Sequence, residues 1–336
     1  MKIEIYQPLS IYELGQRDNQ EDALWPAPDA ATPADRLFIV CDGMGGHEKG
    51  EVASQTVCQA LGQWFDKNIN SHEPFTDAQL REALEYAYQQ LDLKDDDSPK
   101  KMGTTLTLIY IHTQGITAAH IGDSRIYHIR PFSSPHGGGR VGALYQSRDH
   151  SLVYDLYQAG EITYEEMLTS PQKNIITRAM QPGVENRVRP DIIHIIDIQP
   201  DDYFYMCSDG MLEYMTNNEL ASLLSSDASD EVKRQQLIAL TANNLDNHTA
   251  WLIHIKNVIR EEGDDLLTNE EPTSRCNALN TIPQMSLQDE SIPIAEVAES
   301  VVDEEDDVVV IEEAPMKQSL FQRLKGFIRF AKDKKE

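Results

Sequence analysis

The sequence has few cysteines, no excess of basic residues and no long apolar run. Its four cysteines are scattered without a Cys-x-x-Cys pair, which argues against a disulfide framework and a cysteine-based zinc site. No apolar run approaches the roughly 18 residues of a spanning helix. The net charge of −27 argues against nucleic-acid binding through a broad basic face. We therefore expect a cytoplasmic protein with reduced cysteines that binds no nucleic acid.

Charge divides the 336 residues unevenly. Residues 259–316 hold about 17 acidic and 2 basic residues, and the last twenty hold about 7 basic and 2 acidic ones. An acidic segment poor in aromatics cannot bury enough apolar surface to offset its ordering entropy. The predicted domains are a folded domain at 1–256, an acidic disordered linker at 257–316 and a basic amphipathic helix at 317–336.

The C-terminal segment carries apolar residues at helical spacing, flanked by Lys and Arg. Such a helix lies on an anionic membrane, docks in a partner's groove, or folds back onto acidic parts of its own chain. The first alternative would make the protein peripheral at the membrane. Gly326 weakens the isolated helix by about 1 kcal/mol, which favours the other two. The apolar stripe is Leu320, Phe321, Leu324, Phe327, Ile328 and Ala331.

The folded part reads as clusters of strands and pairs of helices, a pattern typical of packed layers rather than of βαβ units. We predict an α+β fold. Strands are expected at 3–14, in two segments within 103–130 joined by a turn at 113–115, at 192–198 and at 250–255. Helices are expected at 51–69, with Val52 on the buried side, at 152–159 and 229–244, and after the capping boxes that begin at Thr76, Thr163 and Thr216.

One stretch organises the rest of the chain. Residues 38–41 are apolar, and Asp42 and a glycine-rich turn that begins at Gly43 follow at once. This pattern predicts a buried strand that stops at Asp42 and then turns sharply. A carboxylate beside exposed backbone carbonyls suits a hard cation such as Mg²⁺ or Mn²⁺. The alternative is a strand, a turn and a helix cap without a metal ion.

Four further acidic stretches lie at predicted strand edges: 17–22, 122–125, 207–210 and 246–249. Aspartates placed in this way can converge on one point of a folded sheet, as in a two-metal centre built from carboxylates. For 17–22 alone, a surface salt-bridge loop is the alternative. For 122–125, the alternative is a β-bulge with a local Asp–Arg pair.

In this order the motifs resemble those of the PP2C (PPM) family of metal-dependent protein serine/threonine phosphatases, in its bacterial branch. The resemblance runs from about residue 10 to about residue 256. It implies a PP2C-like β-sandwich of two antiparallel sheets flanked by helices. The motifs are Arg-x-x-x-Glu-Asp, Asp-Gly-Met-Gly-Gly-His, Gly-Thr-Thr-Leu, Gly-Asp-Ser-Arg, Asp-His-Ser, Thr-Arg-Ala-Met, Ser-Asp-Gly-Met and Asp-Asn-x-Thr.

The resemblance also implies the metal ligands. Asp42 would bridge two Mn²⁺ or Mg²⁺ ions, and the Gly43 carbonyl would ligate one of them. Asp209 and Asp246 would hold the other. Bacterial relatives use the position of Asp123 for a third ion.

Three more residues receive roles from the resemblance. Arg17 would bind the substrate phosphate, Glu21 would contribute to the second metal's shell, and Asp22 would orient water. Eukaryotic relatives have a histidine where this chain has Met44, whose thioether cannot donate a proton. Metal-bound water or His47 is then the general acid, and the sequence leaves both open. Family members carry a mobile flap near the residues numbered 150–176 here.

The implied reaction is hydrolysis of phosphoserine and phosphothreonine in proteins by a metal-bridging water, without a cysteine nucleophile. The partners would be substrates of a serine/threonine kinase in a signalling pathway, and we expect a monomer. The alternative is a catalytically silent phosphoprotein-binding or scaffold module that acts through its C-terminal tail. Retention of all the metal aspartates argues against that alternative.

Overall fold

The computed structural model describes residues 1–45, 49–70, 74–95, 101–131, 143–184 and 187–260. Several predictions fall outside these ranges. They include the role of His47 and almost all of the acidic linker. The C-terminal helix at 317–336 also lies outside the described residues.

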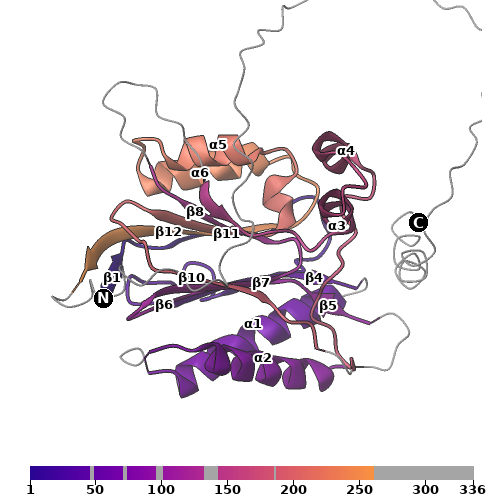
Figure 1. The fold of residues 1–336 in the computed structure, drawn as a ribbon, viewed down its shortest axis with the longest axis horizontal. Helices are drawn as coiled ribbons and strands as arrows, with labels where there is room; N and C mark the ends of the chain where they lie inside the picture. Colours follow the sequence, from indigo (N-terminus) through magenta and orange to yellow (C-terminus); the bar gives the residue numbers. More distant parts are fainter. Residues whose placement is uncertain (46–48, 71–73, 96–100, 132–142, 185–186, 261–336) are drawn as a thin grey trace, which may run out of the picture. The chain divides into compact units, whose positions relative to one another are not determined.

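Within the described ranges, two antiparallel sheets stack face to face (Figure 1). Sheet one has the order β1 (Lys2–Ile5), β12 (His248–Ile259), β11 (Tyr203–Cys207), β8 (Arg125–Ile129) and β9 (Ala143–Gln146), with β2 (Leu9–Glu13) also paired to β12. Sheet two has the order β10 (Asp191–Ile195), β7 (Gly115–Ile121), β6 (Leu106–His112), β4 (Leu37–Met44) and β3 (Asp22–Trp25), with β5 (Gly103–Thr104) paired to β4.

Helices cover the outer faces of both sheets. Figure 1 shows α1 (Lys49–Asn68) and α2 (Asp77–Asp92) below sheet two, and α5 (Asn217–Leu224) and α6 (Asp230–Thr241) above sheet one. The short helices α3 (Leu152–Gln158) and α4 (Tyr164–Thr169) lie together at one end of the sandwich. The predicted α+β sandwich is therefore confirmed.

Three apolar layers hold these elements together in the described part of the chain. The first lies between the α1–α2 pair and sheet two, the second between the sheets, and the third between sheet one and the α5–α6 pair. On β4, Ile39 packs into the first layer and Phe38 into the second. Because β4 is buried on both faces, its sequence is a continuous apolar run rather than an alternating one.

Local signals predicted several boundaries correctly. The capping boxes at Thr76, Thr163 and Thr216 all close, with each threonine side chain accepting from the backbone of the third helical residue. The hairpin between β6 and β7 turns at the predicted place, since His112 pairs with Gly115.

Other expectations were wrong. The single strand predicted at 3–14 is two strands, β1 and β2, on either side of Pro8, which has no backbone N–H to donate. Val52 is 38% exposed, because the buried face of α1 runs through Ala53 and Val57 instead. The last strand is longer than predicted and runs to Ile259.

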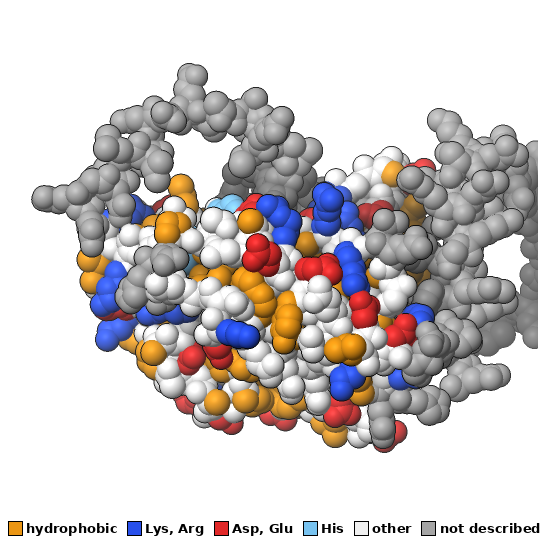
Figure 2. Space-filling model, turned by 90° about the horizontal axis from the view of Figure 1, so that it is seen from below, with side chains coloured by type: hydrophobic (Ala, Val, Ile, Leu, Met, Phe, Trp, Pro, Cys, Tyr) orange, Lys and Arg blue, Asp and Glu red, His pale blue; other side chains and the backbone are white. Residues whose placement is uncertain are grey.

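Among the described helices, none has the length and apolar character needed to cross a membrane. Figure 2, which views the molecule from the side of α1 and α2, shows Lys and Arg interspersed with Asp and Glu. The visible part of this face therefore has no broad basic surface of the kind that nucleic acid requires.

Candidate metal centre

The strand register brings the acidic stretches to one end of the sandwich. In sheet two, Asp22 on β3 pairs directly with Asp42 on β4. In sheet one, Cys207 pairs with both Arg125 and Ala250. Asp123, Asp209 and Asp246 lie within four residues of these paired positions, just outside the strands. They therefore lie at the same end of the sheet. Five aspartates therefore lie near one another at this end of the sandwich, close enough that the other four raise the pKa of Asp42.

Hydrogen bonds from a neighbouring strand fix the backbone of Asp42. Its N–H donates to Oγ1 of Thr105 (2.9 Å), and its carbonyl accepts from the N–H of Thr105 (2.8 Å) and the hydroxyl of Thr104 (2.9 Å). Thr105 Oγ1 also lies 2.7 Å from Oγ of Ser124, beside Asp123. The Gly-Thr-Thr motif thus links two acidic turns, a role that the sequence interpretation had not assigned.

The aspartates strongly perturb one another's protonation. Burial and the charges of Asp209 and Asp246 raise the pKa of Asp22 to about 8. Burial raises the pKa of Asp42 well above its usual range, and the nearby carboxylates of Asp22, Asp209, Asp123 and Asp246 raise it further. Like charges so close together disfavour the ionised state unless a cation is present. Without a cation these carboxyl groups favour the protonated form, and a positive ion among them would favour the ionised form.

Asp123 sits in a sharp turn that a glycine makes possible. Gly122 has a φ of +104°, and a Cβ there would lie 2.6 Å from Cγ2 of Thr105. Asp123 is 7% exposed, and its Oδ1 has no hydrogen-bond partner among the described residues. Arg125 does not pair with it, but makes a two-pronged salt bridge to Asp149 at 2.6 and 2.7 Å. The local Asp–Arg pair considered for this turn is therefore wrong.

Ser208 connects the two sheets below the acidic cluster. Its hydroxyl donates to Oδ2 of Asp22 (2.8 Å) and accepts from the N–H of Thr249 (3.1 Å). Asp209 follows it at the start of the 3₁₀ turn η1 (Asp209–Leu212). Asp209 is thus held close to Asp22, although 187 positions separate them in the sequence (209 − 22).

The loop that carries Arg17 is anchored to the start of β12. Arg17 Nη2 forms a salt bridge with Oδ2 of Asp246 at 2.6 Å, and its side chain is 44% exposed. Asn247 donates to the carbonyls of Leu14 (2.8 Å) and Asn19 (3.0 Å) and accepts from the N–H of Glu21 (2.8 Å). Asn247 therefore fixes the loop. The Asp-Asn-x-Thr motif contained this residue, but nothing in it indicated the distant partners.

Glu21 and Gly43 meet at the start of α1. The N–H of Gly43 donates to the carbonyl of Glu21 (3.0 Å). A Cβ on Gly43 would lie only 2.1 Å from the carbonyl oxygen of Gly50 and 2.5 Å from that of Glu21. Only glycine fits this position without a shift, because the three segments touch through their backbones.

These residues fit a hard divalent cation. The donor set is made of carboxylate and backbone carbonyl oxygens, which Mg²⁺ and Mn²⁺ prefer. Among the described residues, no three of these carboxylates bring oxygen atoms within 4.8 Å of one another, and the buried Oδ1 of Asp123 has no hydrogen-bond partner there. Asp42, Asp209 and Asp246 could hold two ions, with Asp123 beside a third.

A second group of ligating atoms lies behind the Asp123 turn. Among the described residues, His120, His150 and Asp191 bring ligand atoms within 4.8 Å of one another. However, Nη1 of Arg178 lies 3.2 Å from Nε2 of His150 and donates to Oδ1 of Asp191 at 3.1 Å. A guanidinium group thus already supplies positive charge to this cluster, and an ion would have to displace it.

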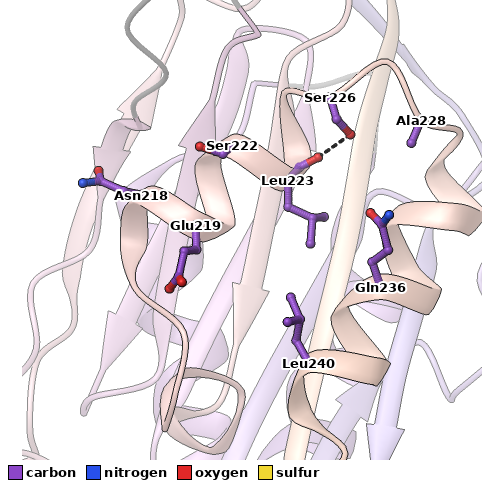
Figure 3. Close-up of a pocket in the computed structure, with 8 residues that line it drawn as sticks. All are labelled: Asn218, Glu219, Ser222, Leu223, Ser226, Ala228, Gln236 and Leu240. Carbon is purple, nitrogen blue, oxygen red and sulfur yellow. Dashed lines mark hydrogen bonds between the residues drawn. The ribbon is translucent and has the colours of Figure 1, made fainter. Parts of the chain in front are cut away.

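A shallow groove of about 620 Å³ lies elsewhere, between α5 and α6. Leu223 and Leu240 face each other across it, and Glu219 and Gln236 contribute to its polar rim (Figure 3). None of the predicted site residues lines it. Its apolar character does not suit a phosphate group.

Comparisons with known proteins agree with the motifs. The family profile described as "Protein phosphatase 2C" matches residues 19–252. "Protein phosphatase PhpP" of Streptococcus pneumoniae is 36% identical over 225 residues, which cover 65% of this chain and 85% of that protein. The "Serine/threonine phosphatase stp" of Listeria monocytogenes is 31% identical over 229 residues, covering 65% and 83%.

Solved structures give the same result. The serine/threonine phosphatase Stp1 from Staphylococcus aureus shares 30% identity and a TM-score of 0.64, covering 76% of this chain and 98% of that one. The catalytic domain of the serine/threonine protein phosphatase PstP was solved in complex with two manganese ions. It shares 27% identity and a TM-score of 0.60, covering 76% and 100%.

Proposed function

This chain belongs to the protein phosphatase 2C family, and from that premise we propose how its own residues carry out the reaction. The protein is a metal-dependent protein serine/threonine phosphatase that uses manganese or magnesium. We assign the two principal ions to Asp42, the Gly43 carbonyl, Asp209 and Asp246.

One observation carries this proposal. Asp22, Asp42 and Asp123 are buried, and burial together with the nearby charge of Asp209 raises the pKa of all three. A cluster of this kind destabilises the folded protein unless it binds cations, so a purely structural role does not explain it. The cluster supports catalysis over the alternative of a silent phosphoprotein-binding module, and no finding favours that alternative.

When bound, the ions supply a nucleophilic water and stabilise charge on the phosphoryl oxygens. The chain's own groups position the substrate. Arg17 is more than a third exposed at the rim, and its guanidinium fork matches two phosphate oxygens. Asn247 holds its loop and Asp246 orients its side chain. Glu21 adds a carboxylate near the ions, and Asp22, held by Ser208, orients water.

The three cysteines in the described part of the chain take no part in this reaction. Cys41, Cys58 and Cys207 are buried free thiols. Burial raises the pKa of Cys41 and of Cys207 well above the usual range, so both stay protonated and are poor nucleophiles. Buried thiols of this kind also support our proposal of a cytoplasmic location.

The substrates we propose are phosphoserine and phosphothreonine proteins that a serine/threonine kinase has modified. We also propose that the catalytic domain acts as a monomer without the tail. Because β12 runs to Ile259, the truncation that tests this should end after Arg260. The truncated protein is expected to keep its turnover of a small aryl phosphate. A scaffold that acts through its tail would instead lose its biological activity on truncation.

Asp209→Asn tests the catalytic assignment. The variant keeps the size of the side chain but removes a ligand charge, so hydrolysis of an aryl phosphate and a phosphothreonine peptide with Mn²⁺ should fall at least about 100-fold. Asp66→Asn, on the exposed face of α1, is the matched control and should behave as wild type. Undiminished Mn²⁺-dependent turnover in a folded Asp209→Asn protein would refute the assignment.

A further inference from the structure

We propose that His150 is a positioning residue for the Asp123 turn, which sets the affinity of the ion that Asp123 holds. This inference rests on the role proposed for Asp123. It concerns a residue outside the acidic cluster that touches neither the phosphate nor the two principal ions.

His150 grips Gly122, the residue before Asp123, at both of its backbone polar groups. The N–H of Gly122 donates to Nδ1 of His150 (3.0 Å), and the N–H of His150 donates to the carbonyl of Gly122 (2.9 Å). Gly122 has left-handed backbone geometry and packs against Thr105. These two bonds therefore fix a turn that would otherwise be pliable.

The imidazole ring is itself fixed from three sides. It is 4% exposed and stacks on His120, with ring centres 4.7 Å apart and planes 10° apart. Nδ1 accepts from Gly122, and Nε2 lies 3.3 Å from Oδ2 of Asp191 and 3.2 Å from Nη1 of Arg178. His120 is held in turn by its own Nε2, 2.7 Å from the carbonyl oxygen of Arg148.

The same ring and its neighbours could be taken for a metal site, but one nitrogen atom of each histidine is already held by the backbone. Nδ1 of His150 accepts from Gly122, and Nε2 of His120 lies against a backbone carbonyl. Arg178 supplies the cation beside Asp191. The cluster therefore holds the His150 ring in place, and Nδ1 of that ring holds the Gly122 backbone.

The consequence reaches Asp123 through one peptide bond. Its buried Oδ1 has no partner in the described chain, and the hydrogen bond given for its carboxylate is to its own backbone N–H. The direction of that oxygen depends on the backbone of Gly122, which His150 holds. Groups that orient a metal ligand from behind typically change metal affinity 10- to 100-fold when they are lost.

Two substitutions of His150 separate its two nitrogen atoms. In His150→Asn, Oδ1 takes the place of Nδ1 and can still accept from Gly122. In His150→Gln, the amide takes the place of Nε2 and can still donate to Asp191. We expect the full-length His150→Asn protein to bind as many Mn²⁺ ions as wild type. His150→Gln should weaken the loosest site at least about 10-fold, as should Asp123→Asn.

The measurement is Mn²⁺ titration followed by electron paramagnetic resonance of the free ion, with melting curves to check the fold of each variant. Equal affinities in His150→Gln and wild type, or equal losses in both His150 variants, would overturn the proposal. Loss of an ion in both His150 variants but not in Asp123→Asn would overturn it too, by placing that ion on the histidines.

Asp191→Asn provides a second route if His150→Gln fails to fold. It leaves the Nδ1 acceptor in place but removes the charged partner of Nε2, so a smaller loss at the loosest site is expected. Unchanged affinity in this variant would count against the proposal that the cluster holds the His150 ring in place. Failure of the phosphatase assignment would appear separately, as Asp209→Asn turnover that is undiminished.

Discussion

Asn247→Ala is expected to destabilise the protein and to weaken substrate binding at the same time. The Asn247 side chain is 3% exposed and makes three hydrogen bonds to the loop that carries Arg17. Alanine removes all three, and the carbonyls of Leu14 and Asn19 and the N–H of Glu21 lose their partners. Water reaches these groups only if the loop moves.

The size of the effect follows from these contacts. A buried hydrogen bond contributes a net of about 1 kcal/mol, so three give about 3 kcal/mol of unfolding free energy. This corresponds to roughly a 100-fold shift in the ratio of folded to unfolded protein. For a domain of this size, the melting temperature should fall by about 6–12 °C.

Urea unfolding monitored by circular dichroism measures the loss, and steady-state kinetics on a phosphopeptide measure KM. Asn68→Ala is the matched control, because the Asn68 side chain makes a single exposed bond to the Trp64 carbonyl. It should change the unfolding free energy by less than about 0.5 kcal/mol. If Asn247→Ala lost less than about 1 kcal/mol and kept its KM, the loop would not depend on Asn247.

Two further predictions concern a strand neighbour of the site and a distant histidine. Thr105→Val removes the acceptor for the Asp42 N–H and should weaken Mn²⁺ binding about 10-fold by calorimetry, whereas Thr105→Ser, which keeps the hydroxyl, should not; equal affinities would refute the link. Burial lowers the pKa of His112 to about 4 from its usual 6.5, so its unfolded form binds more protons, and stability should be lost as the pH falls from 6.5 toward 4. In urea unfolding, His112→Asn should make the unfolding free energy depend less on pH between 4 and 6.5. An unchanged pH dependence would contradict the lowered pKa of His112.

Much of the fold could be read from local sequence, because its signals act over a few residues. The capping box at Thr76 closes within a single helical turn, and the β6–β7 turn joins neighbours. The break between β1 and β2 was missed, although Pro8 marks it, because the alternation on either side suggested one strand. The second strand predicted within 103–130 is also two strands, β7 in sheet two and β8 in sheet one, and the stretch 122–125 that separates them was interpreted only as an acidic turn or a β-bulge.

The candidate site shows the same division. The candidate metal-binding aspartates can be recognised in the sequence by their residue type and by their positions at strand ends. The residues that hold these aspartates and their loops in place cannot be recognised in this way. Asn247 bonds to Asn19 across 228 positions, and Arg125 bonds to Asp149 rather than to the nearby Asp123. Such partners are fixed by three-dimensional packing, which no short motif encodes. The assignment of individual ions to individual ligands came from the family resemblance and remains a prediction.

The position of the acidic cluster at the join between the two sheets has a mechanical consequence. Asp22 and Asp42 belong to sheet two, whereas Asp209 and Asp246 flank strands of sheet one. Ions shared between them would cross-link the two sheets. Any sliding of one sheet over the other would then move the ligands away from the positions that bind the ions. A substitution in the apolar layer between the sheets, such as at Phe38 or Trp251, would then be felt as a change in metal affinity. Because turnover requires the bound ions, we expect it to depend also on how well the layer between the sheets is packed.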